Sequence, residues 1–303
     1  MKDFAGKVAF ITGGASGAGF GQAKVFSQAG CKIVIADIRQ EPLDEALAYF
    51  RAQNAPAHAI RLDITDRAAY ACAADEVEKV FGEPPQLLFN TAGVNSFGPV
   101  ENSTYDDYDW LMGVNFWGVA NGMQTFVPRM IKAGKGGYVV STASVGGFQG
   151  SAVASIYSAA KAAVISLMES YRAGLAKYGI EVSVLCPANI RSNIAEAVKT
   201  RPAHLANTGY NESEEAIASL HSIYSHGMDP VVLAERTKQA MEAGKLYIIP
   251  YPEEKERLAQ HFREIVDSIP PIESDPEGAK ERTEALMNWA KDRGSIFSRG
   301  REG

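Results

Sequence analysis

Short, wholly apolar segments alternate along this chain with segments of helical periodicity. Seven apolar runs are predicted to be strands buried on both faces, and they cover residues 8–12, 33–36, 59–62, 87–90, 138–141, 182–185 and 246–249. Between two of them, Leu43, Leu47 and Phe50 recur at helical spacing. Alternation of this kind predicts an α/β fold, in which a seven-stranded parallel sheet is doubly wound by right-handed crossovers.

Composition narrows the class of ligand. The 303 residues are 46% apolar and carry a net charge of -6 without a long run of Lys or Arg, so a nucleic-acid partner is not expected. The three cysteines (Cys31, Cys72 and Cys186) are far apart and form no Cys-x-x-Cys pattern, which predicts neither a disulfide framework nor a metal site. With no apolar stretch of membrane-spanning length, and a strand close to residue 1, we expect a cytoplasmic protein.

Two segments lie outside the alternation. Residues 190–229 separate the last two strands and are long for a connection within a domain, so they are expected to form a partly helical lid over the substrate. Residues 251–303 carry amphipathic patterns that predict a C-terminal helical extension, packed on the same domain, packed on a neighbouring subunit, or solvated. The catalytic, dinucleotide-binding domain is therefore expected to span residues 1–250.

A glycine-rich turn follows the first strand and opens a helix. Glycines let backbone N–H groups and the positive end of the helix approach a pyrophosphate, although tight turns also use glycine for steric reasons alone. The candidate cofactor residues here are Gly13, Ser16, Gly17 and Gly19.

An acidic residue ends the second strand. Asp37 lies 18 residues beyond Gly19, where its carboxylate can accept both ribose hydroxyls of NAD and repel the 2′-phosphate of NADP. NAD is therefore the expected cofactor. Arg39 either softens this discrimination or is a solvated loop charge.

Two further helices carry residues with a chemical use. Tyr157 and Lys161 are four residues apart, which places a phenol and an ammonium on one helix face, and Ser144 follows the fifth strand. These three residues suggest removal of a proton from an alcohol. Asn115 interrupts a helical pattern over 105–130, and it either bends the helix and holds a water or is tolerated at modest cost.

Polar residues also end the third and fourth strands. Asp63 could hydrogen-bond an adenine, and Asn90-Thr-Ala-Gly93 closes the fourth strand. Each could equally be a helix cap or a turn former.

Together these motifs resemble the classical short-chain dehydrogenases/reductases over residues 5 to about 250, in the motifs Thr12-Gly-x-x-x-Gly-x-Gly19, Asp63, Asn90-x-Ala-Gly93, Asn115, Ser144, Tyr157-x-x-x-Lys161 and Pro187. The resemblance implies a Rossmann fold and a homodimer or homotetramer formed through the exposed faces of two helices. It implies Tyr157 as acid/base, Lys161 as a ribose contact that lowers the pKa of the phenol, Ser144 as a substrate contact, and Asn115 as the anchor of a relay water. Cofactor contacts are implied for Asp63, Ile64, Asn90, Ala92, Gly93, Pro187, Ile190 and Ser192.

Three positions depart from the family pattern without removing a reacting group. Ala18 stands where Ile is common, Thr91 where a second Asn is common, and Ala188-Asn189 where Gly usually follows Pro187.

Longer segments are similar to the bacterial Cα-dehydrogenases of lignin-derived β-aryl ethers: 12–21, 90–98, 188–194 and 246–252. That similarity implies oxidation of a benzylic secondary alcohol to a ketone. The expected substrate contacts are Phe97, Phe148, Ile190 and Asn193, for each of which core packing is an alternative. A hydroxysteroid or polyol dehydrogenase would share the catalytic residues, and a non-catalytic NAD sensor is the alternative from another class.

Overall fold

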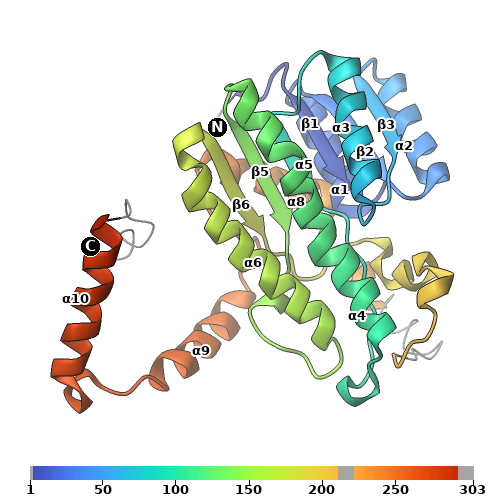
Figure 1. Cartoon of the computed structure of the whole chain (residues 1–303). Helices are drawn as coiled ribbons and strands as arrows, with labels where there is room; N and C mark the ends of the chain where they lie inside the picture. Colours follow the sequence, from blue (N-terminus) through green and yellow to red (C-terminus); the bar gives the residue numbers. More distant parts are fainter. Residues whose placement is uncertain (1–2, 211–221, 293–303) are drawn as a thin grey trace. The chain divides into compact units, whose positions relative to one another are not determined.

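The structure is a computed structural model that describes residues 3–210 and 222–292 (Figure 1). Packing of the backbone divides the chain into two compact units, Met1–Tyr251 and Pro252–Gly303. None of the helices in the described ranges is both long and apolar enough to cross a membrane.

The first unit is built on one parallel sheet. Its strand order is β3-β2-β1-β4-β5-β6-β7, so the chain reverses direction across the sheet between β1 and β4 (Figure 1). All seven predicted strands are present, with the bounds β1 (Val8–Thr12), β2 (Lys32–Asp37), β3 (Ala57–Arg61), β4 (Leu87–Asn90), β5 (Gly137–Thr142), β6 (Ile180–Leu185) and β7 (Tyr247–Ile248). In open α/β sheets, ligands bind outside the carboxyl ends of the strands near such a reversal.

Helices cover both faces of the sheet, with the bounds α1 (Gly17–Gln28), α2 (Gln40–Ala52), α3 (Arg67–Phe81), α4 (Tyr105–Met112), α5 (Gly118–Ala133), α6 (Ser155–Leu175) and α8 (Pro230–Glu242). Strand side chains alternate between two cores because successive residues point to opposite faces. Phe10 and Val34 pack with α3, α5 and α6, whereas Ile11 and Ile33 pack with α1, α2 and α8. The two cores together confirm the doubly wound architecture.

The helical pattern over 105–130 does not form one regular helix. A π-helix, η2 (Gly113–Trp117), joins α4 to α5 and is centred on Asn115. Asn115 is fully buried, and its Nδ2 donates to the carbonyl of Leu111, 2.9 Å away. The amide thus reaches the carbonyl that its own backbone N–H would bond in a regular α-helix. The distortion supports the interpretation that Asn115 bends the helix.

Short 3₁₀ helices connect the longer elements: η1 (Val100–Asn102), η3 (Val145–Gly147), η4 (Ala176–Tyr178), η5 (Asn193–Thr200) and η6 (Ala203–Leu205). The last two belong to the 190–229 segment, whose residues 211–221 lie outside the described ranges. The ends of this segment meet, because Ile190 and Met228 form a parallel bridge. Arg191 N donates to Met228 O at 3.1 Å, and Met228 N donates to Asn189 O at 2.9 Å.

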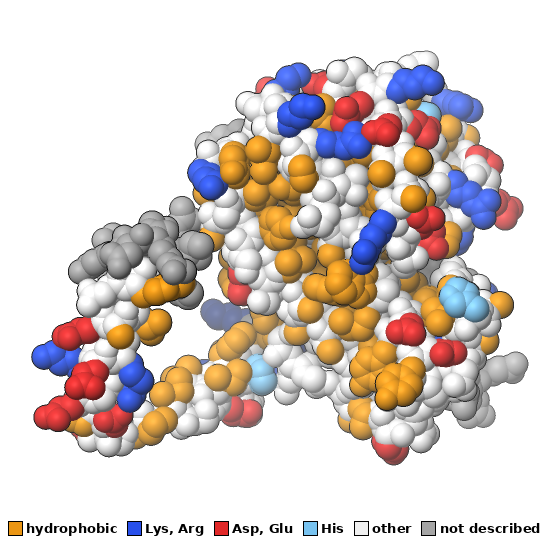
Figure 2. All heavy atoms as spheres, viewed as in Figure 1, with side chains coloured by type: hydrophobic (Ala, Val, Ile, Leu, Met, Phe, Trp, Pro, Cys, Tyr) orange, Lys and Arg blue, Asp and Glu red, His pale blue; other side chains and the backbone are white. Residues whose placement is uncertain are grey.

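The second unit contains two helices, α9 (Glu254–Asp267) and α10 (Pro276–Asp292), separated by the 3₁₀ turn η7 (Ile272–Ser274). Pro270 and Pro271 lie between α9 and η7, where proline cannot continue a helix. Many apolar side chains of this unit are exposed (Figure 2). Val266 in α9, Leu286 in α10 and Ile269, just beyond α9, are each more than half accessible.

Candidate active site

The glycine-rich turn lies at the carboxyl end of β1, beside the reversal of the sheet. Gly17 has φ +50°, which disfavours any side chain, and a Cβ added at Gly19 would lie 2.2 Å from the carbonyl oxygen of Gly13. The turn is attached to β4 because Thr12 Oγ1 accepts from Thr91 N at 2.9 Å and from Ala92 N at 3.1 Å. Backbone therefore approaches backbone here, and the turn has the shape of a phosphate cradle.

Thr91 replaces the Asn that is common at this position. Its hydroxyl donates to Gln22 Oε1 at 2.6 Å and accepts from Thr142 Oγ1 at 3.4 Å. The departure therefore retains polar links from β4 to α1 and to β5.

Asp37 is buried at the end of β2 and is not free of partners in this structure. Its carboxylate accepts from Arg39 Nε at 3.0 Å, from Arg39 Nη2 at 3.1 Å and from Arg39 N at 3.1 Å. Arg39 Nη2 also donates to Ser16 Oγ at 2.8 Å. Arg39 therefore links the acidic strand end to the glycine-rich turn, and its interpretation as a solvated loop charge is wrong.

Lys161 lies at the centre of the site. It is almost fully buried, and its Nζ donates to the carbonyl of Thr142 at 2.9 Å and lies 5.5 Å from the centre of the Tyr157 ring. A Cβ added to Gly93 would lie 3.4 Å from Lys161 Nζ and 3.0 Å from Asn115 Oδ1. The end of β4, the π-helix and α6 therefore bring Gly93, Asn115 and Lys161 together.

Asn115 uses both hydrogens of its amide within the protein. Nδ2 donates to Val94 O as well as to Leu111 O, both at 2.9 Å, and Oδ1 accepts from Val94 N at 3.2 Å. These bonds fix the chain just beyond Gly93. Sequence reasoning identified the residue, but not that its side chain holds the backbone that follows β4.

Ser144 lies close enough to Tyr157 to influence the pKa of its phenol. Ser144 Oγ accepts from Gly146 N at 3.0 Å and donates to Pro187 O at 3.4 Å. Because Val145 N donates to Pro187 O at 3.0 Å, the ends of β5 and β6 hold the serine in place. The serine, the tyrosine and the lysine thus converge at one strand edge.

Burial is the largest influence on the pKa values of Tyr157 and Lys161. It raises the pKa of the Tyr157 phenol above its ordinary value, while the hydrogen bond from Ser144 acts in the opposite direction. Burial of the ammonium also lowers the pKa of Lys161 to about 8. The resemblance implied that Lys161 lowers the pKa of the phenol, whereas in this structure burial raises it.

The lowered pKa of Lys161 makes stability depend on pH. Between pH 8 and 10.5, the ordinary pKa of a lysine, the unfolded chain holds a proton on Lys161 that the folded chain has lost, so the free energy of unfolding rises with pH. We expect the free energy of unfolding of the wild type, relative to that of Lys161→Met, to rise by about 2 kcal/mol from about pH 8 to 9.5. Urea denaturation at a series of pH values measures it, and parallel curves for the two proteins would contradict it.

The remaining strand-end residues divide into two kinds. Asp63 is exposed, and its Oδ1 accepts from Thr65 N at 2.9 Å and from Thr65 Oγ1 at 2.7 Å, which is a turn-forming role. Ile64 is buried against Gly118. Asn90 is buried, and its Nδ2 donates to Ser141 Oγ at 3.1 Å, so its side chain ties β4 to β5.

The predicted substrate residues are not all placed together. Ile190 packs against the core that α1 and α8 share, and Ser192 lies beside Gly17 at the start of η5. The ring of Phe148 lies 6.3 Å from that of Tyr247 in β7. Phe97 is partly buried, and the side chain of Asn193 lies outside the described part of the chain.

Sequence reasoning missed the anchor of the 190–229 segment. Asp107, fully buried in α4, accepts from Arg201 Nη1 at 2.6 Å, Thr208 Oγ1 at 2.7 Å and Gly209 N at 2.9 Å. Although burial alone would raise the pKa of Asp107, these hydrogen bonds and that from Thr104 N lower it to about 2. The capping box formed by Thr104 and Asp107 was the available signal, but it indicates a helix start and no distant partner.

The anchored segment covers an apolar cluster next to α6, the helix that carries Tyr157 and Lys161. Trp110, Ile156, Ala197 and Tyr210 are buried together, and Tyr210 Oη lies 2.9 Å from Ser155 Oγ. Tyr210 also packs directly on Gly98. The segment is therefore positioned over the start of α6, two residues from Tyr157.

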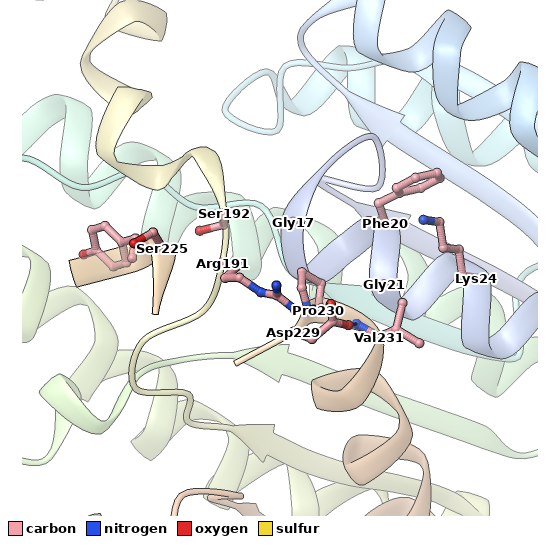
Figure 3. A pocket seen from close by; sticks show the side chains of 11 residues that line it. Gly17, Phe20, Gly21, Lys24, Arg191, Ser192, Ser225, Asp229, Pro230 and Val231 are labelled. Atoms are coloured by element: carbon pink, nitrogen blue, oxygen red, sulfur yellow. Dashed lines mark hydrogen bonds and ion pairs between the residues drawn. The ribbon is translucent and has the colours of Figure 1, made fainter. Parts of the chain in front are cut away.

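A cavity of about 530 Å³ lies between α1, the start of α8 and the ends of the 190–229 segment (Figure 3). Gly17, Lys24 and Ser192 line it. Arg191 and Asp229 line it as well, and they form an ion pair in which Arg191 Nη2 lies 2.5 Å from Asp229 Oδ2. Its contact with Gly17 and Ser192 connects it to the glycine-rich turn. In the part of the chain that the structure describes, no cluster of His, Cys, Asp or Glu is arranged to hold a metal ion.

Comparison with known proteins agrees with this geometry. The family model described as short chain dehydrogenase matches residues 7–203. The chain is 63% identical over 300 residues to a protein named C alpha-dehydrogenase from Sphingobium sp. (strain NBRC 103272 / SYK-6), with 99% of this chain and 98% of that one covered. The chain belongs to the short-chain dehydrogenase family, which confirms the resemblance found in the sequence.

Solved structures show the same likeness. The crystal structure of the apo form of LigD from Sphingobium sp. strain SYK-6 is 55% identical, with a TM-score of 0.76, and covers 89% of this chain and 100% of that one. A short chain dehydrogenase/reductase from Burkholderia phymatum in complex with NAD is 32% identical, with a TM-score of 0.84, and covers 89% and 98% of the two chains.

Proposed function

We propose that this protein is an NAD-dependent dehydrogenase that oxidises the benzylic (Cα) secondary alcohol of a lignin-derived β-aryl ether to the ketone. The observation that carries the chemistry is the burial of Lys161 one helical turn from Tyr157, with its Nζ 5.5 Å from the centre of the phenol ring. The substrate class is supported by the 63% identity, along nearly the whole chain, to a protein named for Cα dehydrogenation.

The residues present fit a dinucleotide. Gly13, Gly17 and Gly19 leave a cradle that a side chain would fill, and Asp37 supplies a buried carboxylate for ribose hydroxyls. We propose that Gly93, Lys161, Pro187, Ile190 and Ser192 hold the nicotinamide end. NAD bound there would supply the hydride acceptor and a positive charge near the phenol.

In the proposed reaction, Ser144 donates a hydrogen bond to the substrate oxygen and Tyr157 takes the hydroxyl proton. Ser144 lies close enough to Tyr157 to influence the pKa of its phenol, so an alcohol oxygen between the two hydroxyls would be within reach of both. Lys161 favours the tyrosinate by its charge, and Asn115 holds Val94 and the strand end that faces it. We assign Asn115 the further role of anchoring a relay water through its backbone.

We further propose that residues 1–250 form the catalytic domain, that the 190–229 segment is its substrate lid, and that 251–303 is a helical extension. The protein is proposed to act in the cytoplasm as a homodimer or homotetramer. Exposed aromatic side chains support an interface along the helix that contains the π-turn, since Tyr105, Tyr108 and Trp117 are 89%, 47% and 49% accessible. Light scattering of the purified protein measures its mass.

The substrate claim has a direct test. We expect NADH to form when the protein is mixed with NAD⁺ and a β-aryl ether that carries a free benzylic hydroxyl, and none with the analogue whose benzylic carbon is a methylene. A hydroxysteroid and a polyol serve as competing substrates in the same assay. Faster turnover of either one would transfer the proposal to that alcohol, and NAD⁺ binding without turnover of any alcohol would favour a sensor.

A further inference from the structure

The first turn of α6 carries the proposed catalytic phenol and follows an alanine. Ser155 opens the helix, and Tyr157 is its third residue. Backbone N–H groups at the start of a helix have no partner within it, and a side-chain oxygen of the preceding residue commonly accepts from them. Asp66 and Asp229 do so for α3 and α8, whereas Ala154, which precedes α6, has only a methyl group. The turn that holds Tyr157 therefore depends on contacts from elsewhere in the chain.

One such contact comes from the 190–229 segment. Tyr210 is buried, and its Oη lies 2.9 Å from Ser155 Oγ, which is hydrogen-bonding distance for two hydroxyls. The bond reaches the first residue of α6, two residues before Tyr157. A residue far along the chain thus holds the helix at the end where its own sequence supplies no cap.

The backbone next to Tyr210 is itself held in place. Gly209 N donates to Asp107 Oδ2 at 2.9 Å. Thr208 Oγ1 donates to Asp107 Oδ1 at 2.7 Å and accepts from Tyr210 N at 3.0 Å. A Cβ added at Gly209 would lie 1.0 Å from the carbonyl oxygen of Asn102, so this part of the chain fits closely against its neighbour. The phenol of Tyr210 therefore projects from a fixed backbone.

The ring of Tyr210 packs against the chain that leads into α6. A Cβ added at Gly98 would lie 2.3 Å from Tyr210 Cδ1, so the ring lies directly on the backbone of Gly98. Gly98 N in turn donates to Val153 O at 2.9 Å, two residues before the helix begins. A side chain that is already ordered by its packing loses little further entropy when its hydroxyl bonds to Ser155.

We propose that Tyr210 is a positioning residue for the dehydrogenation: its hydrogen bond to Ser155 holds the first turn of α6 in the conformation that presents Tyr157 to the alcohol. This inference rests on the proposed function, because it gives Tyr210 a part in the same reaction. Helix ends open more readily than helix interiors, so the bond acts where the position of Tyr157 is least secure. Attachment of residues 208–210 to Asp107 is thereby coupled to the order of the catalytic turn.

Steady-state kinetics of Tyr210→Phe test this role. The ring and its packing on Gly98 remain, and only the hydroxyl that reaches Ser155 is removed. We expect kcat for a benzylic alcohol to fall by about three- to tenfold, the factor that one ordinary hydrogen bond represents, while KM for the alcohol and the dissociation constant of NAD⁺ change by about twofold at most. Ser155→Ala removes the other hydroxyl and should have the same effect. The double variant should be no slower than the slower single variant, because both changes break one contact.

Amide hydrogen exchange, followed by mass spectrometry, gives a readout that does not depend on turnover. We expect peptides that contain residues 155–158 to exchange about three- to tenfold faster in Tyr210→Phe than in the wild type, and peptides from β1 to exchange equally in both. Ser166→Ala is the control, since Ser166 is exposed further along α6, and it should change neither kcat nor the exchange of the first turn. A thermal melt of each variant checks that it is folded.

The outcomes separate this inference from the proposed function. A lower kcat together with faster exchange confined to the first turn of α6 supports the positioning role. An unchanged kcat in Tyr210→Phe, or unchanged exchange at residues 155–158, overturns it. Faster exchange throughout the protein would make Tyr210 a general stabilising residue and overturns it as well. If the wild type turns over no alcohol, the proposed function fails, and the exchange measurement still decides whether Tyr210 orders the turn.

Discussion

Replacing Tyr157 by Phe is expected to leave NAD⁺ binding intact and to reduce turnover by about a thousandfold or more. The ring and its packing remain, and only the phenol hydroxyl, the group proposed to take the proton, is lost. General acid–base groups typically contribute factors of this size. Calorimetry with NAD⁺ and steady-state rates with a benzylic alcohol measure the two effects separately.

The matched control for this change is Tyr178→Phe. Tyr178 follows the same helix in η4, and its side chain is 42% accessible, so the variant should bind NAD⁺ and turn over alcohol as the wild type does. If Tyr157→Phe keeps most of its activity, another group transfers the proton and the catalytic assignment is wrong. Loss of NAD⁺ affinity in Tyr157→Phe would instead give the phenol a role in binding the cofactor.

Replacing Asp107 by Asn is expected to destabilise the protein by about 3 kcal/mol. Asp107 is fully buried and the Arg201 side chain is 10% accessible, so the neutral amide leaves a buried guanidinium without its counter-charge. The free energy of unfolding, measured in urea, reports the loss. Because the same carboxylate holds Thr208 and Gly209, limited proteolysis should cut the 190–229 segment faster in this variant.

Asp109→Asn is the control for that experiment, since Asp109 is exposed on the same helix. It should change stability by no more than a few tenths of a kcal/mol, as surface substitutions usually do. If Asp107→Asn unfolds at the same urea concentration as the wild type, the ion pair does not anchor the segment. Because the pKa of Asp107 is lowered to about 2, the stabilisation that it provides depends on pH. It is present above the pKa of the same carboxyl in the unfolded chain, and it declines as the pH falls towards 2.

Most of the scaffold could be predicted from the sequence because its elements depend on local patterns. Strands such as Val8–Thr12 and Leu87–Asn90 are continuous apolar runs and appear with the predicted bounds. The start of α3 is equally local, because the side chain of Asp66 accepts from Ala68 N and Ala69 N. In each case the information lies within a few residues.

Sequence reasoning could not supply the contacts that depend on partners far along the chain. Nothing near Asp107 shows that Arg201, 94 residues later, will reach it. Arg39 looks like a loop charge until Ser16 is seen 2.8 Å from it. Phe148 was chosen for its aromatic face, but its position relative to the site depends on β7, where Tyr247 lies beside it.

The bridge between Ile190 and Met228 has a consequence for how this enzyme family could diversify. A loop whose ends are pinned side by side can grow or shrink at little entropic cost, about 0.6 kcal/mol for each doubling of its length. The residues between the two ends can therefore be replaced together, while β6 and α8, which flank the segment, stay unchanged. Replacement of this one segment would change which alcohols the enzyme accepts, while the residues proposed for hydride transfer stay the same.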